Sequence, residues 1–217
     1  MKISGISTIA VALVMGIGAG SVAMAQGLTV TASGVKTVKL SDRVSKNQFV
    51  WVSNAPLENM KGTAEGVSGT LTLDPKNLST LHGTVGAMVN TMKSGNAMRD
   101  AHIQSPQWLD GAKYPSISFT IGSVSGIKVA GNSATGVATG KFTMHGVTKS
   151  LSVPFKITYL DESAETRKRA PGDLVMITAT FGVALADYNV SGARGTIGSK
   201  VGEKIQVTAQ LFGSTGL

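Results

Sequence analysis

Hydrophobic and polar residues alternate along most of this chain, which is the pattern of β-strands that bury one face. In residues 67–73, Val67, Leu71 and Leu73 fall on one face, while serine and threonine fall on the other. The same period of two runs through residues 81–89, 117–121, 151–159, 175–185 and 205–211. Turn residues separate these runs, so each run predicts an antiparallel strand.

Further strands are predicted at residues 35–40 and 48–53, and a strand of less clear parity at 135–144. Residues 54–65 are expected to form a turn-rich connection, and the charged segment 161–172 a long exposed loop. The total is eight or nine strands that share one apolar face. Closing the sheet into a barrel would bury that face and remove both exposed edges.

One stretch, residues 99–119, lacks this alternation and reads RDAHIQSPQWLDGAKYPSISF. Its first part, Arg99–Gln104, is compatible with a helix, and Ser105–Pro106 breaks it. A second short turn carries Trp108–Asp110, and Tyr114–Pro115 then forces an extended conformation. We therefore expect one or two short helical turns lying across one end of an all-β fold.

The first residues predict a cleavable secretory signal over Met1–Ala25. Lys2 supplies a positive start, an apolar run follows, and Ala23-Met24-Ala25 forms a small-x-small cleavage site. Residues 26–217 are then expected to form a single domain located in the periplasm. The chain has no cysteine, so its hydrophobic core must hold the fold without disulfides.

The formal net charge is +8, but the basic residues are scattered. Their one run, Arg167-Lys168-Arg169, fits either a solvated loop or a contact with anionic lipid headgroups. We expect no nucleic-acid partner. Transient contact with a membrane surface and a homodimer are both compatible with the composition.

Few residues are arranged for catalysis. The three histidines, His82, His102 and His145, show no metal-ligand spacing, so we expect neither a metal nor a cofactor. Arg99 and Asp100 are adjacent, and neighbours on a helix point in different directions, which favours a structural role as a cap or tie. The functional alternative places Arg99 and His102 at the mouth of a tunnel, against a lipid headgroup. No nucleophile elbow or dinucleotide motif occurs, so an enzyme is not expected.

Two blocks of this sequence stand out as motifs. The first block contains Arg99, Asp100, His102, Trp108, Asp110, Tyr114, Pro115 and Phe119, and the second is GKFTMHGVTKSLSV over residues 140–153. Together they resemble the YceI-like family of periplasmic proteins. The resemblance covers about residues 49–212. It implies an antiparallel lipocalin-like barrel of about eight strands, whose apolar tunnel holds a polyisoprenoid or a similar long lipid.

The resulting hypothesis is a non-catalytic carrier or reservoir for a long apolar lipid of the polyisoprenoid, isoprenoid-quinone or fatty-acid-amide type. The residues expected to line the lumen are the inward apolar positions Phe49, Trp51, Val85, Phe119, Ile121, Phe155, Ile157, Val175, Ile177, Phe181 and Val207. One alternative is an interaction or stress-response module with a packed interior and no ligand. Another is an enzyme acting on a bound isoprenoid, which would require His102, His145 and an acid to converge.

Overall fold

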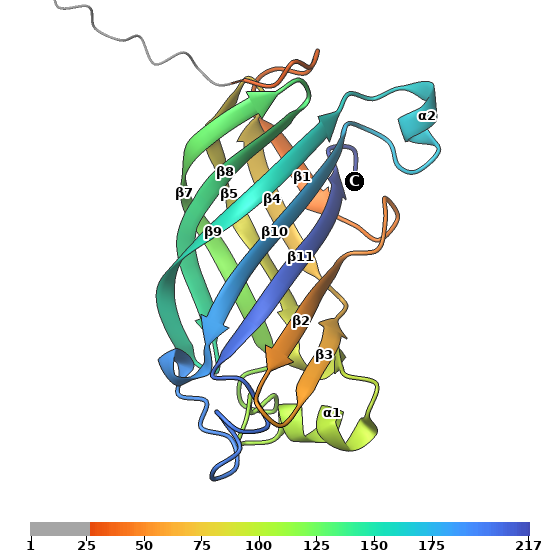
Figure 1. Ribbon diagram of the computed structural model, residues 1–217. Coiled ribbons are helices and arrows are strands. Elements are labelled where there is room, and N and C mark those ends of the chain that lie inside the picture. Colours follow the sequence, from red (N-terminus) through yellow and green to blue (C-terminus); the bar gives the residue numbers. More distant parts are fainter. Residues whose placement is uncertain (1–26) are drawn as a thin grey trace, which may run out of the picture.

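The computed structural model describes residues 27–217; the expected signal over Met1–Ala25 lies outside them. The strands form one eleven-stranded sheet in which paired neighbours are antiparallel, so the expected all-β barrel is confirmed (Figure 1). The strands are β1 (Lys36–Leu40), β2 (Gln48–Asn54), β3 (Asn59–Ala64), β4 (Ser68–Asp74), β5 (Asn77–Met88), β6 (Met92–Lys93), β7 (Ser116–Ala130), β8 (Ser133–Met144), β9 (Val147–Leu160), β10 (Leu174–Ala184) and β11 (Lys204–Ser214). The helices are α1 (Ala97–Gln104) and α2 (Ala164–Arg167), with 3-10 turns η1 (Val89–Thr91) and η2 (Leu185–Tyr188).

Different strands form the barrel wall in its two halves along the barrel axis. Eight strands follow one another in the sheet in the order β1-β4-β5-β7-β8-β9-β10-β11, and the sheet closes into a barrel because β1 also pairs with β11. This pairing involves only Gly213 and Ser214 of β11. Residues 205–210 of β11 pair with β2 instead, and β3 continues from β2. One half of the barrel is therefore closed by the short strand β1, and the other half is widened by β2 and β3. Because barrel diameter grows with strand number, the half widened by β2 and β3 has the wider interior.

The narrow half, which we call the closed end, is filled by side chains. Val38, Leu73, Leu78, Ile157 and Tyr159 each have 0% relative exposure there. The Tyr159 hydroxyl donates to an Asp173 carboxylate oxygen at 2.6 Å. Burial and this acidic neighbour raise the pKa of Tyr159 well above its usual value.

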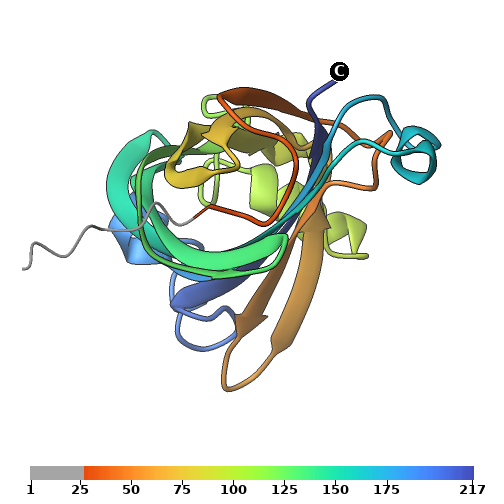
Figure 2. The ribbon, with the colours of Figure 1, turned by 90° about the horizontal axis from the view of Figure 1, so that it is seen from above.

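Residues 27–32, which we call the N-terminal segment, cross the closed end (Figure 2). The Leu28 amide donates to the Pro75 carbonyl at 2.7 Å. The amides of Thr31 and Ala32 donate to the two carboxylate oxygens of Asp161, at 2.7 and 3.0 Å. Burial alone would raise the pKa of Asp161, but these hydrogen bonds outweigh it and hold the pKa below its usual value. The segment thus seals the closed end by hydrogen bonds as well as by Leu28, which is buried.

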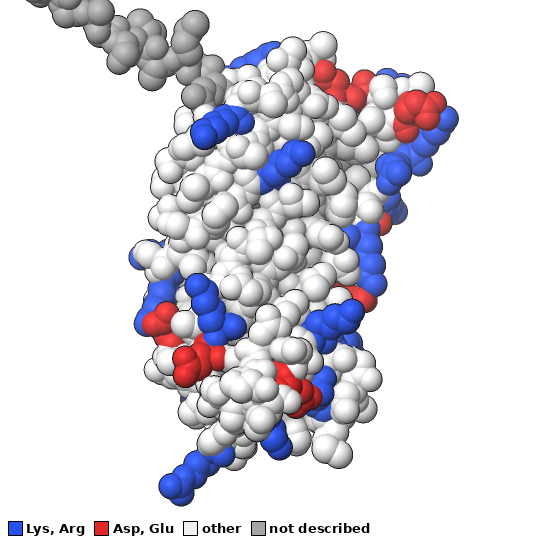
Figure 3. All heavy atoms as spheres, in the orientation of Figure 1, with Lys and Arg blue, Asp and Glu red and all other residues white. Residues whose placement is uncertain are grey.

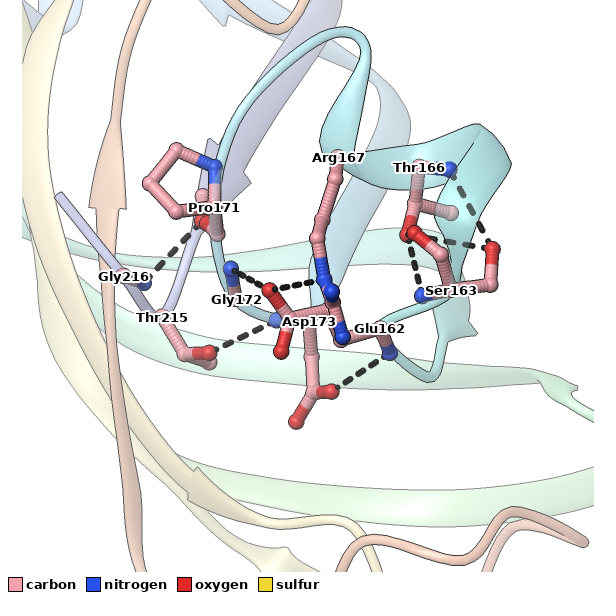
Figure 4. A network of polar contacts seen from close by, with 10 residues as sticks. Glu162, Ser163, Thr166, Arg167, Pro171, Gly172, Asp173, Thr215 and Gly216 are labelled. Carbon is pink, nitrogen blue, oxygen red and sulfur yellow. Dashed lines mark hydrogen bonds and ion pairs between the residues drawn. The ribbon is translucent and has the colours of Figure 1, made fainter.

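The excursion after β9, predicted as a long exposed loop, contains the short helix α2 and is tied down (Figure 4). Ser163 and Thr166 form a reciprocal capping box at its start. One Glu162 carboxylate oxygen accepts from the Gly172 amide at 3.0 Å and pairs with Arg167 Nε at 3.0 Å. The excursion lies at the closed end, beside the end of β11 (Figure 1).

The opposite end is crossed by α1, where the sequence predicted a helical turn. Asn96 caps the helix by accepting from the amides of Met98 and Arg99. The second predicted turn, at Trp108–Asp110, is a non-helical turn in which Asp110 has a φ of 46°. The expectation of a turn-rich connection over residues 54–65 is wrong, because residues 59–64 form strand β3.

Candidate functional site

The wide half of the barrel encloses a cavity of about 580 Å³. It extends from the middle of β4, β5 and β10 to the α1 end, and its wall is mostly aliphatic and aromatic. Asn96, Met98 and Lys200 belong to the wall and are exposed, so the cavity opens to solvent beside α1. We call this opening the mouth.

Most of the residues expected to line the lumen do line this cavity. They are Phe49, Trp51, Val85, Phe119, Ile121, Phe155, Ile177, Phe181 and Val207. Ile157 and Val175 do not, because their side chains, 0% and 2% exposed, are packed in the filled interior of the closed end, where Val175 is the register partner of Tyr159. Their inward direction was predicted correctly, but alternation along a strand does not say which half of the barrel is hollow.

Glycines in the barrel wall let large aromatic side chains lie close against it. A Cβ at Gly136 would approach the Phe155 ring to 3.2 Å, and one at Gly140 would approach the Phe119 ring to 3.0 Å. On the opposite side of the barrel, the Trp51 indole lies across Gly62 of β3 in the same manner, since Trp51 and Gly62 are register partners. Aromatic rings that lie against neighbouring strands leave the centre of the lumen open.

Part of the wall was missed in the sequence. β3 contributes Met60 and Ala64, and β8 contributes Phe142 and Met144. In β3 the inward positions are Met, Gly and Ala, and two of these are too small to stand out as hydrophobic, so the period of two is hard to see. The polar residues between them were the signal that could have revealed the strand. Trp108 also lines the cavity, so both tryptophans of the chain border it.

Polar groups gather at the mouth. Arg99 Nη2 donates to Glu58 Oε1 at 2.7 Å, joining α1 to the β2–β3 turn, and both residues line the cavity together with His102. Asp100 does not face this group: one of its carboxylate oxygens accepts from the Ser94 amide and hydroxyl, both at 2.7 Å. These hydrogen bonds hold the pKa of Asp100 below its usual value. Asp100 therefore ties α1 to the preceding segment, while Arg99 and His102 border the opening.

The three histidines do not come together. His102 borders the cavity, His145 bonds the Tyr188 carbonyl at 2.9 Å outside the cavity wall, and His82 is exposed on β5. Within residues 27–217, no group of three or more His, Cys, Asp or Glu is placed to hold a metal ion. In the same range, no helix has both the length and the apolar character needed to cross a membrane.

The fold and the site define a class of protein: an antiparallel β-barrel with an apolar internal cavity that opens at one end. Within that class the chain belongs to the YceI-like domain family, whose family model matches residues 33–212. Protein YceI of Salmonella newport is 28% identical over 180 residues, which cover 82% of this chain and 89% of the relative. Protein YceI of Salmonella arizonae has the same identity and coverage.

Solved structures share the fold at lower identity. Burkholderia cenocepacia BcnA matches with a TM-score of 0.64 and 18% identity, covering 80% of this chain and 98% of BcnA. A polyisoprenoid binding domain from Saccharophagus degradans, implicated in plant cell wall breakdown, matches with a TM-score of 0.60 and 12% identity. That match covers 84% of this chain and 99% of the domain. At these identities the similarities show that the fold is shared.

Proposed function

We propose that this protein is a non-catalytic carrier or reservoir for a long apolar lipid in the periplasm. The observation that carries the proposal is the apolar cavity of about 580 Å³ with a polar cluster at its mouth. Its volume lies within the range of about 300–1,000 Å³ that is usual for small-molecule sites. The lipid tail lies among the aromatic and aliphatic wall residues, and its headgroup meets Arg99 and His102. Polyisoprenoids, isoprenoid quinones and fatty-acid amides all have this form.

The energetics favour exchange with a membrane over tight storage. Burying a methylene group from water gains about 0.8 kcal/mol, so ten buried methylenes would contribute about 8 kcal/mol. The physiological competitor is a bilayer, which is as apolar as the cavity, and against that reference the net gain is small. Such a protein takes up a lipid from one membrane and releases it to another, with selectivity set by the shape of the lumen and the contacts at the mouth.

Two measurements test the proposal. Organic extracts of protein purified from its own host are expected to contain a long-chain lipid in near-stoichiometric amount by mass spectrometry. Delipidated protein should take up an added isoprenoid or fatty-acid amide, and because Trp51 and Trp108 both border the cavity, their fluorescence should report the binding. Empty extracts together with an unresponsive tryptophan signal would contradict a carrier role.

A matched pair of variants locates the binding site. Ala209 is an inward residue of the cavity wall, whereas Gln206 on the same strand is exposed on the outer face. Ala209→Phe is expected to project a ring into the lumen and weaken lipid uptake strongly, while strain against neighbouring side chains costs at most about 1–3 kcal/mol in stability. Gln206→Phe should bind lipid as the parent protein does. Equal binding by both variants would place the ligand elsewhere.

Neither alternative function is favoured by a specific observation. A module with a fully packed interior conflicts with the cavity in the wide half of the barrel. An enzyme built on converging His102 and His145 conflicts with their separation, since only His102 borders the cavity.

A further inference from the structure

Three chain segments frame the mouth, and we call them together the rim: residues 54–61, 93–100 and 191–204. They contact one another through the Arg99–Glu58 ion pair and through the Leu57 amide, which donates to the Ser199 carbonyl at 3.0 Å. The cavity wall includes residues from all three segments. The rim is therefore a continuous surface around the opening.

The rim exposes two large apolar side chains. Leu57 is 72% exposed and Met98 is 71% exposed, which places them among the most exposed large hydrophobic residues in residues 27–217. A single exposed leucine is ordinary on a protein surface. Here the two stand on adjoining segments at the entrance of an apolar cavity, and Met98 is itself part of the cavity wall.

The charge of the rim is mainly positive. Its basic residues are Lys61, Lys93, Arg99, Arg194, Lys200 and Lys204, and its acidic residues are Glu58, Asp100 and Glu203. Asp100 is buried and Glu58 is paired with Arg99, so the outward charge comes chiefly from Lys and Arg. Figure 3 shows Lys and Arg, together with some Asp and Glu, at this lower end, whereas the middle of the barrel wall in that view is largely uncharged.

The basic run Arg167–Arg169, considered from sequence as a headgroup contact, is placed differently. It lies at the closed end, away from the mouth (Figure 1). Its charges are also engaged: Arg167 pairs with Glu162, Lys168 pairs with Glu165 at 2.6 Å, and Arg169 donates to the Val44 carbonyl. Two of its three cations are thus paired with carboxylates, and the run has no access to the cavity.

We propose that the rim docks on an anionic phospholipid bilayer. Leu57 and Met98 enter the apolar boundary of the membrane, while the surrounding Lys and Arg side chains meet anionic headgroups. The cavity then faces the bilayer, and a lipid passes between them without crossing water. This inference rests on the proposed carrier function and adds to it the membrane partner and the face that meets it.

Vesicle binding tests the docking surface. The protein is mixed with phosphatidylcholine vesicles that either contain or lack phosphatidylglycerol, and bound protein is measured by flotation. The parent protein should bind the anionic vesicles, and added salt should weaken the binding. Leu57→Asp combined with Arg194→Glu should lower binding by about tenfold or more, because the two changes remove an apolar contact and a cation and add two anions. Neither Leu57 nor Arg194 lines the cavity, so tryptophan-detected uptake of a detergent-dispersed lipid should be unchanged.

The closed end supplies matched controls. Val35 is 72% exposed there, and Val35→Asp combined with Lys168→Glu makes the same kinds of change away from the mouth. This control should bind vesicles normally. Equal loss of vesicle binding in both double variants, or no loss in the rim variant, would overturn the docking proposal.

The failure of docking can be told from the failure of the carrier function. Lipid uptake by the parent protein without vesicle binding would overturn docking alone, whereas vesicle binding without lipid uptake would overturn the carrier function. A dimer that dissociates in the rim variant would show that a second copy of the chain covers this surface, and would also overturn docking.

Discussion

The division of the barrel into a filled half and a hollow half can be tested by two truncations in the same molecule. Ile157 is fully buried at the closed end and does not border the cavity. Ile157→Ala removes packed atoms and leaves a new void, so it is expected to cost about 2–5 kcal/mol. Phe181 borders the existing cavity and is only partly buried, and its main defined contact is an edge-to-face pair with Phe142 at 5.9 Å.

Phe181→Ala should therefore cost less than a fully buried phenylalanine would, about 1–2 kcal/mol, of which about 0.5–1.5 kcal/mol is the aromatic pair. Urea unfolding followed by circular dichroism gives both values. Thermal midpoints should fall by roughly 5–15 °C for Ile157→Ala and by less for Phe181→Ala. Lipid binding should change only for Phe181→Ala. If Phe181→Ala proves as costly as Ile157→Ala, the wide half is packed and the reasoning from the cavity fails.

Three further changes have defined outcomes. Asp161→Asn weakens the attachment of the N-terminal segment. Because folding lowers the pKa of Asp161, the stabilisation that its carboxylate gives to the folded protein is present above about pH 4 and is lost as the pH falls through the lowered pKa. Urea unfolding should show a deficit of under about 1 kcal/mol near neutral pH, because solvent screens the partly buried carboxylate, and a smaller deficit as the pH falls below about 4. Tyr159→Phe removes the hydrogen bond to Asp173 and should cost about 1.5–3 kcal/mol in the same assay, and an unchanged unfolding midpoint would contradict that contact. Gly62→Val places a side chain where the Trp51 ring lies, so it should shift the tryptophan emission and weaken lipid uptake; an unaltered spectrum would show that the ring does not rest there.

Much of the fold follows from local pattern. The alternation in residues 151–159 and 175–185 fixed both strand type and inward face, and the break at Ser105–Pro106 marked the end of α1. These features depend on residues close together in the chain, which is why a single sequence is sufficient to predict them.

The position of the cavity does not follow from local pattern. It depends on which strand pairs with each part of β11, and that choice joins residues far apart in the chain, such as Leu40 with Gly213 and Trp51 with Val207. Ile157 and Phe155 occupy equivalent inward positions on one strand, yet only Phe155 borders the cavity. Sequence periodicity specifies the inward face, and long-range pairing decides whether that face meets other side chains or a hollow.

Both ends of the described chain lie on the same side of the barrel. Gly27 is beside Lys76, and Gly216 is beside Pro171, so the two ends emerge at the closed end (Figure 1). A linker joined directly to Gly27 or to Leu217 would therefore tether the barrel with its opening directed away from the support. Fusions to sensor chips, beads or scaffold proteins should retain the capacity to load cargo from solution without any redesign of the opening.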